Sequence, residues 1–257
     1  MSPAAEDRTA WVSAPSVDRS LGPKLLPSVL SLTAGSVDAI GFLGLGGLFT
    51  THITGNLVVL SAHVVSGRTA PFAAMLAVPV FMAVLGLTRL LAAGLEAIGL
   101  ATLRPLLLLQ FLLLGGFLGL CVAAGPRIDP DAPTAILAGM LGVSAMAVQN
   151  ALLQISLTGA PATAVMTTNV ARFMIDIGDV LLGRDPEAVA RARSRANHTW
   201  PPIVGFTVGC GLGAAGEAAI GLWSLALPAG LALLAFAMGF SVKRRVSRVL
   251  ARTFPSP

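Results

Sequence analysis

The feature that most constrains this chain is a succession of apolar stretches, most of them long enough to cross a lipid bilayer. These stretches cover about 25–49, 51–65, 71–100, 106–125, 134–157, 162–182, 201–222 and 224–240. Because a helix rises about 1.5 Å per residue, about 20 apolar residues cross the roughly 30 Å hydrocarbon core of a membrane. The sequence therefore predicts an all-α fold, a polytopic bundle of transmembrane helices.

The composition also favours lipid as the solvent of this chain. Charged residues make up 11% of it, against about 25% in a typical soluble domain, and the mean hydropathy is +0.82. The net charge of +5 comes mostly from Lys and Arg in loops and tails that flank the apolar stretches. That placement is typical of the positive-inside rule. We therefore expect the lipid bilayer as a partner and no nucleic acid.

Three segments are expected along the chain. Residues 1–24 are polar and predicted to form a disordered cytoplasmic tail, 25–242 a single transmembrane domain, and 243–257 a basic cytoplasmic tail. A cleaved signal peptide is not expected, because the leading polar segment contains Glu6 and Asp7 and the next apolar run is too long. The expected arrangement is several crossings of the membrane, with both termini in the cytoplasm.

The number of crossings stays open between six and eight. If the short stretches 51–65 and 162–182 cross the membrane, there are eight crossings; if both are re-entrant, there are six. Eight is slightly preferred, because the outer connections are then short and poor in charge. The proline-rich loop 126–133 divides the chain into two pseudo-repeated halves, about 25–125 and 133–242. Their repeat is parallel with eight crossings and inverted with six.

The first half contains a polar break in the segment Gly35–Asn56, which reads GSVDAIGFLGLGGLFTTHITGN. An ionisable group at membrane depth is unfavourable unless it is paired or hydrated, so it is a candidate for function. The candidate site residues here are Asp38, Thr50, Thr51, His52, Thr54 and Asn56. Asp38 is interpreted either as a protonatable or ion-binding group, or as a structural partner for a helix terminus or an arginine. The polar cluster is interpreted as a small-molecule or ion site, or as helix capping.

The second half contains a weaker polar break, MTTNVARFMIDIGD, which begins at Met166. The candidate site residues of this half are Gln149, Asn150, Thr167, Thr168, Asn169, Arg172 and Asp176. The two amides before the break either form interhelical hydrogen bonds or line the site. Arg172 and Asp176 lie four residues apart, so they can pair within one helix. We predict that the two breaks face one another near the middle of the membrane.

The remaining motifs indicate packing and not chemistry. Gly205, Gly209 and Gly213 recur every fourth residue, which predicts the close approach of a neighbouring helix. Cys121 and Cys210 lie within apolar stretches and are interpreted as small core residues. No metal site and no cofactor are predicted. The sequence has no zinc-protease, serine-hydrolase or nucleotide-binding motif, so no enzyme is predicted.

Three segments resemble the YoaK-like family of bacterial inner-membrane proteins, a family of unknown function. These segments are GSVDAIGFLGLGGLFTTHITGN, AMAVQNALLQ and TTNVARF. The likeness covers about 27–240, and the Asp38 segment followed by THITGN is its most specific part. The second break departs from the family, which tends to carry a Thr-Gly pair where this chain has Ala171 and Arg172. The resemblance implies a small membrane protein, and it implies no reaction and no catalytic residue.

These features predict a small secondary transporter or permease for a small molecule or ion, with a polar site at mid-membrane. The first alternative is a non-transporting membrane component that binds a protein partner or lipid through the basic loop 184–195 and the basic tail. The second alternative is an intramembrane enzyme, which would require a close acid–histidine pair in a water-filled cavity. The sequence does not decide the oligomeric state, and an oligomer is compatible with it.

Overall fold

A computed structural model describes residues 21–67, 71–183 and 185–240. The tails expected at 1–20 and 241–257 lie outside the described residues. The first helix begins at Leu21, so the last residues of the tail predicted at 1–24 belong to that helix.

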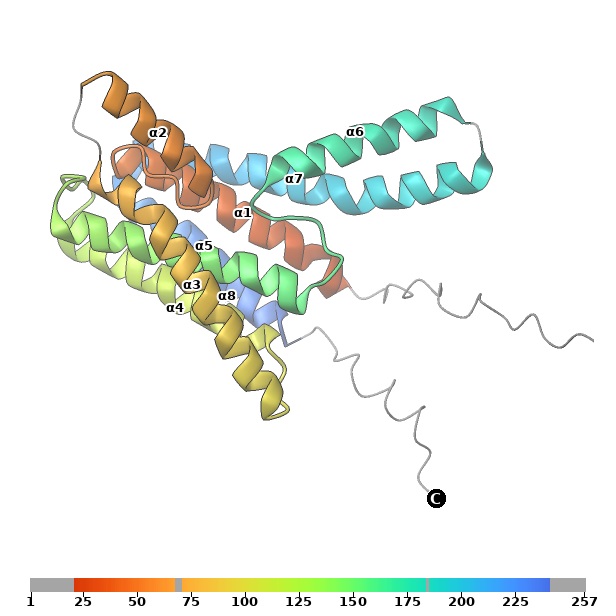
Figure 1. Ribbon diagram of the computed structural model, residues 1–257, viewed down its shortest axis with the longest axis horizontal. Coiled ribbons are helices and arrows are strands. Elements are labelled where there is room, and N and C mark those ends of the chain that lie inside the picture. The colour runs from red at the N-terminus through yellow and green to blue at the C-terminus, as the bar shows by residue number, and fades with distance from the viewer. Residues whose placement is uncertain (1–20, 68–70, 184, 241–257) are drawn as a thin grey trace, which may run out of the picture.

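The described residues form eight α-helices and one 3₁₀ helix, without a strand, and the predicted all-helical fold is confirmed (Figure 1). The helices are α1 (Leu21–Gly44), α2 (Ile53–Val65), α3 (Phe72–Ala97), α4 (Leu103–Ala124), α5 (Pro133–Ser156), α6 (Met166–Leu182), α7 (Pro186–Ile220), η1 (Gly221–Leu225) and α8 (Ala226–Met238).

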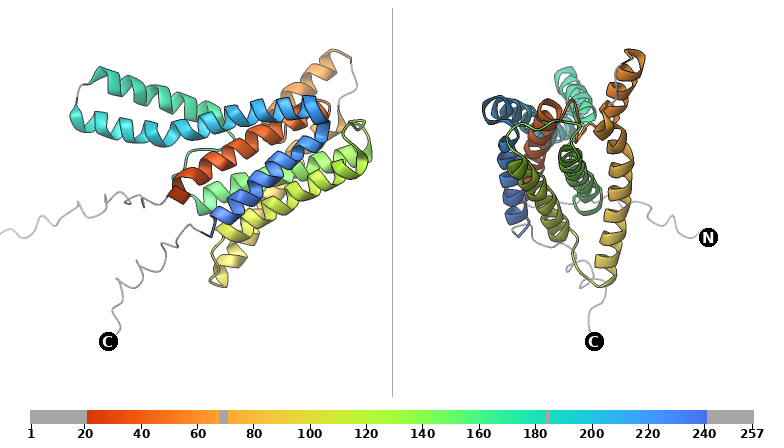
Figure 2. Two further views of the ribbon diagram at one scale, coloured as in Figure 1. Left: turned by 180° about the vertical axis from the view of Figure 1, so that it is seen from behind. Right: turned by 90° about the vertical axis from the view of Figure 1, so that its left-hand side faces the viewer.

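Five helical segments are long and apolar enough to cross a membrane. They are Leu25–Gly44, Phe72–Ala97, Leu103–Ala124, Pro133–Ser156 and Pro186–Met238. The last segment contains α7 and α8, which run in opposite directions on either side of η1 (Figures 1 and 2).

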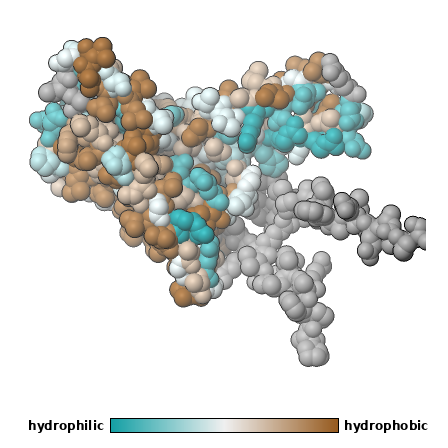
Figure 3. Space-filling view, viewed as in Figure 1, coloured by the Kyte–Doolittle hydropathy of each residue, from teal (hydrophilic) through white to brown (hydrophobic). Residues whose placement is uncertain are grey.

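The outer surface of the bundle is apolar, as expected of a body surrounded by lipid. On α3, for example, Met82 and Leu90 are 67% and 69% exposed. Brown, hydrophobic side chains dominate the face of α2 and α3, whereas hydrophilic ones gather on the paired α6 and α7 (Figure 3). This distribution matches a helical membrane protein, because apolar side chains need no protein cover in lipid.

Helix α1 is central to the bundle and packs closely against α7. A Cβ atom added at Gly205 would lie 2.7 Å from the Ser28 carbonyl oxygen, and one at Gly213 would lie 2.6 Å from that of Ser36. Gly209 approaches the Leu32 carbonyl oxygen still more closely. The two backbones are therefore in contact along three helical turns, and the predicted glycine stripe is confirmed.

The short helices α2 and α6 both begin inside the bundle and not at either end (Figure 1). After α1, the chain reverses at Gly46 and Gly47, whose φ angles of +65° and +86° favour glycine. Residues 45–52 then return beside α1, and α2 leads back out. In the second half, 157–165 return from the end of α5, and α6 leads out as a hairpin with α7 that projects beyond the bundle (Figure 2).

The α1–α7 crossing predicts opposite effects for two neighbouring glycines of α7. Gly209→Ala is expected to lower the free energy of unfolding by about 1–3 kcal/mol, because its methyl group would overlap the Leu32 carbonyl. Gly211→Ala meets no atom within 4 Å and is expected to be neutral or to stabilise the helix by up to about 1 kcal/mol. Thermal unfolding in detergent measures both. Equal losses would contradict the crossing.

Candidate functional site

The candidate site is organised around the carboxylate of Asp38, which lies in α1 and is 3% exposed. Its Oδ1 accepts the backbone N–H of Thr51 (2.7 Å) and the hydroxyl of Thr50 (3.4 Å). Its Oδ2 lies 2.6 Å from Nδ1 of His52. Three successive residues of the first polar break thus converge on one side chain, as the sequence hypothesis of a functional or structural partner requires.

The break can approach α1 because small residues leave room for it. The Thr51 hydroxyl donates to the Ala34 carbonyl of α1 (3.2 Å). Gly41 faces the Leu48 carbonyl oxygen and the Thr50 methyl group, each 3.1 Å from an added Cβ. On the other side, an added Cβ at Gly142 of α5 would lie 3.1 Å from the same methyl group. Residues 45–52 therefore occupy a slot between α1 and α5 that larger side chains would close.

Asn56 holds the two ends of the break together. Its Oδ1 accepts the backbone N–H of Phe49 (2.9 Å), and its Nδ2 donates to the Phe49 carbonyl (2.8 Å). Asn56 is fully buried, so both backbone groups of Phe49 would lack partners without it. We call this pair of bonds the Asn56 clamp; its role is structural, whereas the sequence placed Asn56 in the pathway.

A pocket of about 590 Å³ opens beside the Asp38–His52 pair. It is lined by Asp38, Ala39, Phe42, Phe49, His52, Thr54, Gly55, Val58, Phe206 and Cys210. The ring of His52 meets those of Phe49 and Phe206 edge to face, with ring centres 6.0 Å and 5.5 Å apart. The His52 side chain is 43% exposed. The site is therefore an open pocket with aromatic walls and one acid–imidazole pair.

The pair has two charge states, which differ by the second ring proton of His52. Imidazole ordinarily exchanges a proton between about pH 5 and 8. With His52 protonated the pair is neutral, and with His52 neutral it carries one negative charge. Among the described residues, His52 is the cationic side chain that pairs with Asp38. The Asp38–His52 pair is therefore suited to taking up and releasing one proton beside a pocket of small-molecule size.

A second polar cluster connects the other break to α1. Gln149 of α5 donates to the Leu30 carbonyl (3.0 Å) and to the Thr163 hydroxyl (2.8 Å), and it accepts from Gln110 of α4 (2.6 Å). The Leu30 carbonyl is one turn from that of Ala34, which holds the first break. The first break therefore bonds to α1 directly, whereas Thr163, just before the second break, is connected to α1 through Gln149. The pocket itself is lined by the first break, its flanking helices and α7.

The remaining predicted site residues lie away from the pocket. Asn169 donates to the Ala162 carbonyl (2.6 Å). Asn150 donates to the Met146 carbonyl of its own helix (2.8 Å). Three further side chains are exposed on α6, namely Thr167, Thr168 and Arg172.

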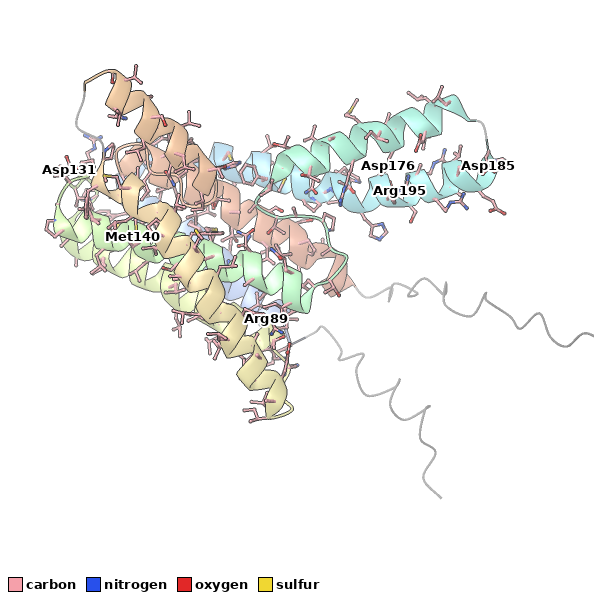
Figure 4. The ribbon with its side chains drawn as sticks, in the orientation of Figure 1. Arg89, Asp131, Met140, Asp176, Asp185 and Arg195 are labelled. Carbon is pink, nitrogen blue, oxygen red and sulfur yellow. The ribbon has the colours of Figure 1, made fainter. Side chains whose placement is uncertain are left out.

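Asp176 does not pair with Arg172, which corrects the interpretation of their spacing. Its Oδ1 instead accepts Nε and Nη2 of Arg195 from α7, at 2.9 Å and 2.6 Å (Figure 4). The two residues join the two arms of the hairpin. Spacing within one helix gave no sign of this contact, because the partner is on another helix.

Sequence reasoning missed the aromatic wall and the thiol of the pocket. Phe42, Phe49, Phe206 and Cys210 resemble any other apolar residue of a membrane helix. Thr163 was missed although a signal existed, because it precedes Asn169 by the same spacing that separates Thr50 from Asn56. Among the described residues, no three His, Cys, Asp or Glu side chains are placed to hold a metal ion.

Comparison with known proteins gives a family. A family model described as "Protein of unknown function (DUF1275)" matches residues 26–238. The chain belongs to this family. A 35-residue segment is 60% identical to UPF0700 transmembrane protein YoaK of Bacillus subtilis (strain 168), and this match covers 14% of the chain and 16% of that protein. The YoaK-like resemblance is thereby confirmed, and no solved structure matches the chain.

The Asn56 clamp of this DUF1275 chain is expected to stabilise the fold. Asn56→Ala should lower the free energy of unfolding by about 2 kcal/mol or more, because two buried backbone groups lose their partners. Ser61→Ala on the same helix is the control, since its exposed hydroxyl bonds only to the Leu57 carbonyl of its own helix (2.8 Å). Thermal unfolding in detergent measures both. A loss no larger for Asn56→Ala would contradict the clamp.

Proposed function

We propose that this protein is a small secondary transporter of the bacterial inner membrane, in which the Asp38–His52 pair exchanges a proton as the pocket loads. The observation that carries the proposal is the 2.6 Å contact of a buried carboxylate with an imidazole in a pocket of about 590 Å³. A protonatable pair at membrane depth is a functional feature by default. The pocket is of the size that usually holds a small molecule, about 300–1,000 Å³.

We infer an inverted repeat of the two halves, which supports this proposal. We match α1–α4 with α5–α8 in order. When each helix is replaced by its match in the other half, an observed pair of packed helices becomes another observed pair. The α1–α7 contact becomes α5–α3, α1–α8 becomes α5–α4, and α2–α3 becomes α6–α7, and all of these pairs pack together. Helices α1 and α5 run in opposite directions (Figure 1). Such repeats recur in transporters whose binding sites lie at the repeat interface.

The polar breaks repeat in the same register. The same distance along the chain separates Thr50 from Thr163 and Asn56 from Asn169. Each Asn donates to the carbonyl of the residue seven positions before it. Each Thr hydrogen-bonds to a polar side chain of the long helix that precedes it in the sequence. That side chain is Asp38 in the first half and Gln149 in the second. The repeated position therefore has an ionisable side chain in the first half and a neutral amide in the second.

The helix lengths favour six crossings over eight. The 13 residues of α2 extend only about 20 Å, short of a hydrocarbon core of about 30 Å. Helix α8 also has 13 residues, but it directly continues the five residues of η1, and only the two together are long enough to cross. Both short helices also begin inside the bundle (Figure 1). We propose that α1, α3, α4, α5, α7 and α8 cross the membrane and that α2 and α6 are re-entrant from opposite sides.

The distribution of charged residues between the two ends of the bundle indicates which end faces the cytoplasm. The end of the bundle at which α1 begins carries Arg89, Arg104, Arg191, Arg193 and Arg195, some of them labelled in Figure 4. The opposite end carries Arg127 with Asp129, Asp131 and Glu217. By the positive-inside rule the first end is cytoplasmic. Both termini then belong to the cytoplasmic side.

The acid–histidine pair meets one of the two conditions set for an intramembrane enzyme, the close contact of an acid with a histidine. An enzyme of this kind would need a nucleophile beside His52, and Thr54 and Cys210 are the hydroxyl and thiol that line the pocket. In the described residues neither side chain hydrogen-bonds to His52; the ring is bonded to Asp38 alone. We therefore favour transport. Loss of function in Cys210→Ala with Asp38 intact would favour the enzyme.

Cysteine labelling at two loop positions distinguishes six membrane crossings from eight in intact cells. With six crossings, a cysteine replacing Leu100 between α3 and α4 is cytoplasmic, and one replacing Asp131 between α4 and α5 is external. With eight crossings the two sides are exchanged. We expect a membrane-impermeant maleimide to label Asp131→Cys and not Leu100→Cys in intact cells.

The labelling is carried out in a background in which Cys121 and Cys210 are replaced by alanine. Glu187→Cys is the internal reference and Ile220→Cys the external one, because both arrangements place them alike. Permeabilised cells should be labelled at every position. Labelling of Leu100→Cys alone in intact cells would contradict six crossings.

The proposal also predicts a loss of proton coupling in Asp38→Asn. Asparagine keeps the shape and can still accept the Thr51 N–H, but it cannot carry the charge that His52 balances. In proteoliposomes with an imposed pH gradient, gradient-driven accumulation of solutes from a panel of small molecules should fall to the protein-free level. Glu96→Gln, an exposed acid paired with Arg89 at 3.5 Å, is the control and should accumulate like the native chain. Unchanged accumulation in Asp38→Asn would remove Asp38 from the mechanism.

A further inference from the structure

We propose that the pocket beside Asp38 binds an organic ammonium group and releases one proton in exchange. This inference rests on the proposed transport function and names the class of its substrate. Three features of the pocket support it, namely its size, its aromatic wall and its single negative charge.

The volume of the pocket argues against a bare inorganic ion as its occupant. A pocket of about 590 Å³ lies within the range of sites for small organic molecules, about 300–1,000 Å³. Most of its lining is apolar, and a small inorganic cation would find few oxygen ligands there. Phe42, Phe49, Phe206 and Val58 instead offer apolar surface to carbon groups. The occupant therefore has an organic body.

The aromatic wall favours a positive charge on that body. Aromatic faces attract cations through the ring quadrupole, and the attraction grows where water is excluded. Phe42 and Phe49 lie with ring centres 4.6 Å apart, and Phe206 flanks His52 on the other side. A substituted ammonium can contact these rings through its carbon groups while its charge faces Asp38. An anion would meet the same rings and a carboxylate, which is unfavourable.

The ionisable groups of the pocket decide the exchange. The titratable side chains that line it are Asp38 of α1, His52 of the break and Cys210 of α7. With His52 protonated, its charge balances Asp38 and the empty pocket is neutral. When an ammonium group enters, it takes over the carboxylate charge, and His52 releases its extra proton. One cation enters, one proton leaves, and the charge of the site is unchanged.

The ammonium group has two sources, a free solute or the headgroup of a lipid. The chemistry is the same in both cases. The lipid composition of the vesicles separates them, because phosphatidylglycerol vesicles contain no ammonium headgroup and phosphatidylcholine vesicles contain one per lipid.

The test uses the full chain in phosphatidylglycerol vesicles that hold a pH-sensitive dye. Benzyltrimethylammonium, benzyl alcohol and benzoate serve as cationic, neutral and anionic probes of similar size. We expect the cation alone to bind and to release about one proton per molecule bound, and Asp38→Asn to abolish both. Phosphatidylcholine vesicles that suppress cation binding identify a lipid headgroup as the occupant; unchanged binding identifies a free solute.

Two phenylalanine variants test the aromatic wall without removing charge. Phe206→Leu keeps an apolar side chain and should weaken cation binding about 3- to 30-fold, as a lost cation–π contact predicts. Phe236→Leu is the control, because its ring packs against Phe240 outside the pocket, and its binding should match the native chain.

The outcomes also separate this inference from the transport proposal. Benzyl alcohol or benzoate, and not the cation, could trigger the Asp38-dependent proton flux. That result would overturn the ammonium inference and leave the transport proposal standing. Absence of binding and of proton flux with every probe, together with native behaviour of Asp38→Asn in the solute panel, would overturn both.

Discussion

The hydrogen bond from the Thr51 backbone N–H to the Asp38 carboxylate, 2.7 Å long, is the interaction on which the rest of this structure depends. Backbone outside a helix must find partners within the protein at membrane depth, because lipid offers none. In the first break, those partners are Asp38, the Ala34 carbonyl and the amide of Asn56. Without these partners, residues 45–52 would not be held beside α1, and the pocket would lack one of its walls.

The same carboxylate holds the break and also carries the chemistry that we propose. Oδ1 holds the break, while Oδ2 faces His52 and the pocket. Because the two oxygens have separate partners, we expect a neutral substitute at this position to fold and to lose the proposed proton exchange. In the second half, the side chain that bonds to the corresponding threonine is Gln149, which donates to the Thr163 hydroxyl and carries no charge. In the proposed repeat, the protonatable pair therefore belongs to the first half alone.

Much of this arrangement could be predicted from the sequence, but its pairings could not. Apolar stretches predict the helices, and the spacing of Gly205, Gly209 and Gly213 predicts a close crossing. Asp38 and the THITGN segment were predicted as a site because polar groups in an apolar run need partners. Which partners they find depends on how helices distant in sequence pack. Asp176 pairs with Arg195 across a hairpin, and the phenylalanine side chains become a pocket wall only after α1, the break and α7 come together.

The most direct test of this account is a solid-state NMR measurement of the dipolar coupling between the Asp38 carboxyl carbon and the Thr51 amide nitrogen, in the full chain in lipid. A hydrogen bond predicts a strong coupling, with the two nuclei on the order of 3.5 Å apart. The coupling should persist when the neighbouring His52 gains or loses its proton, because Oδ1 holds the break in both states. Absence of the coupling in folded protein would show that the break is held in some other way, and the account of the site would be wrong.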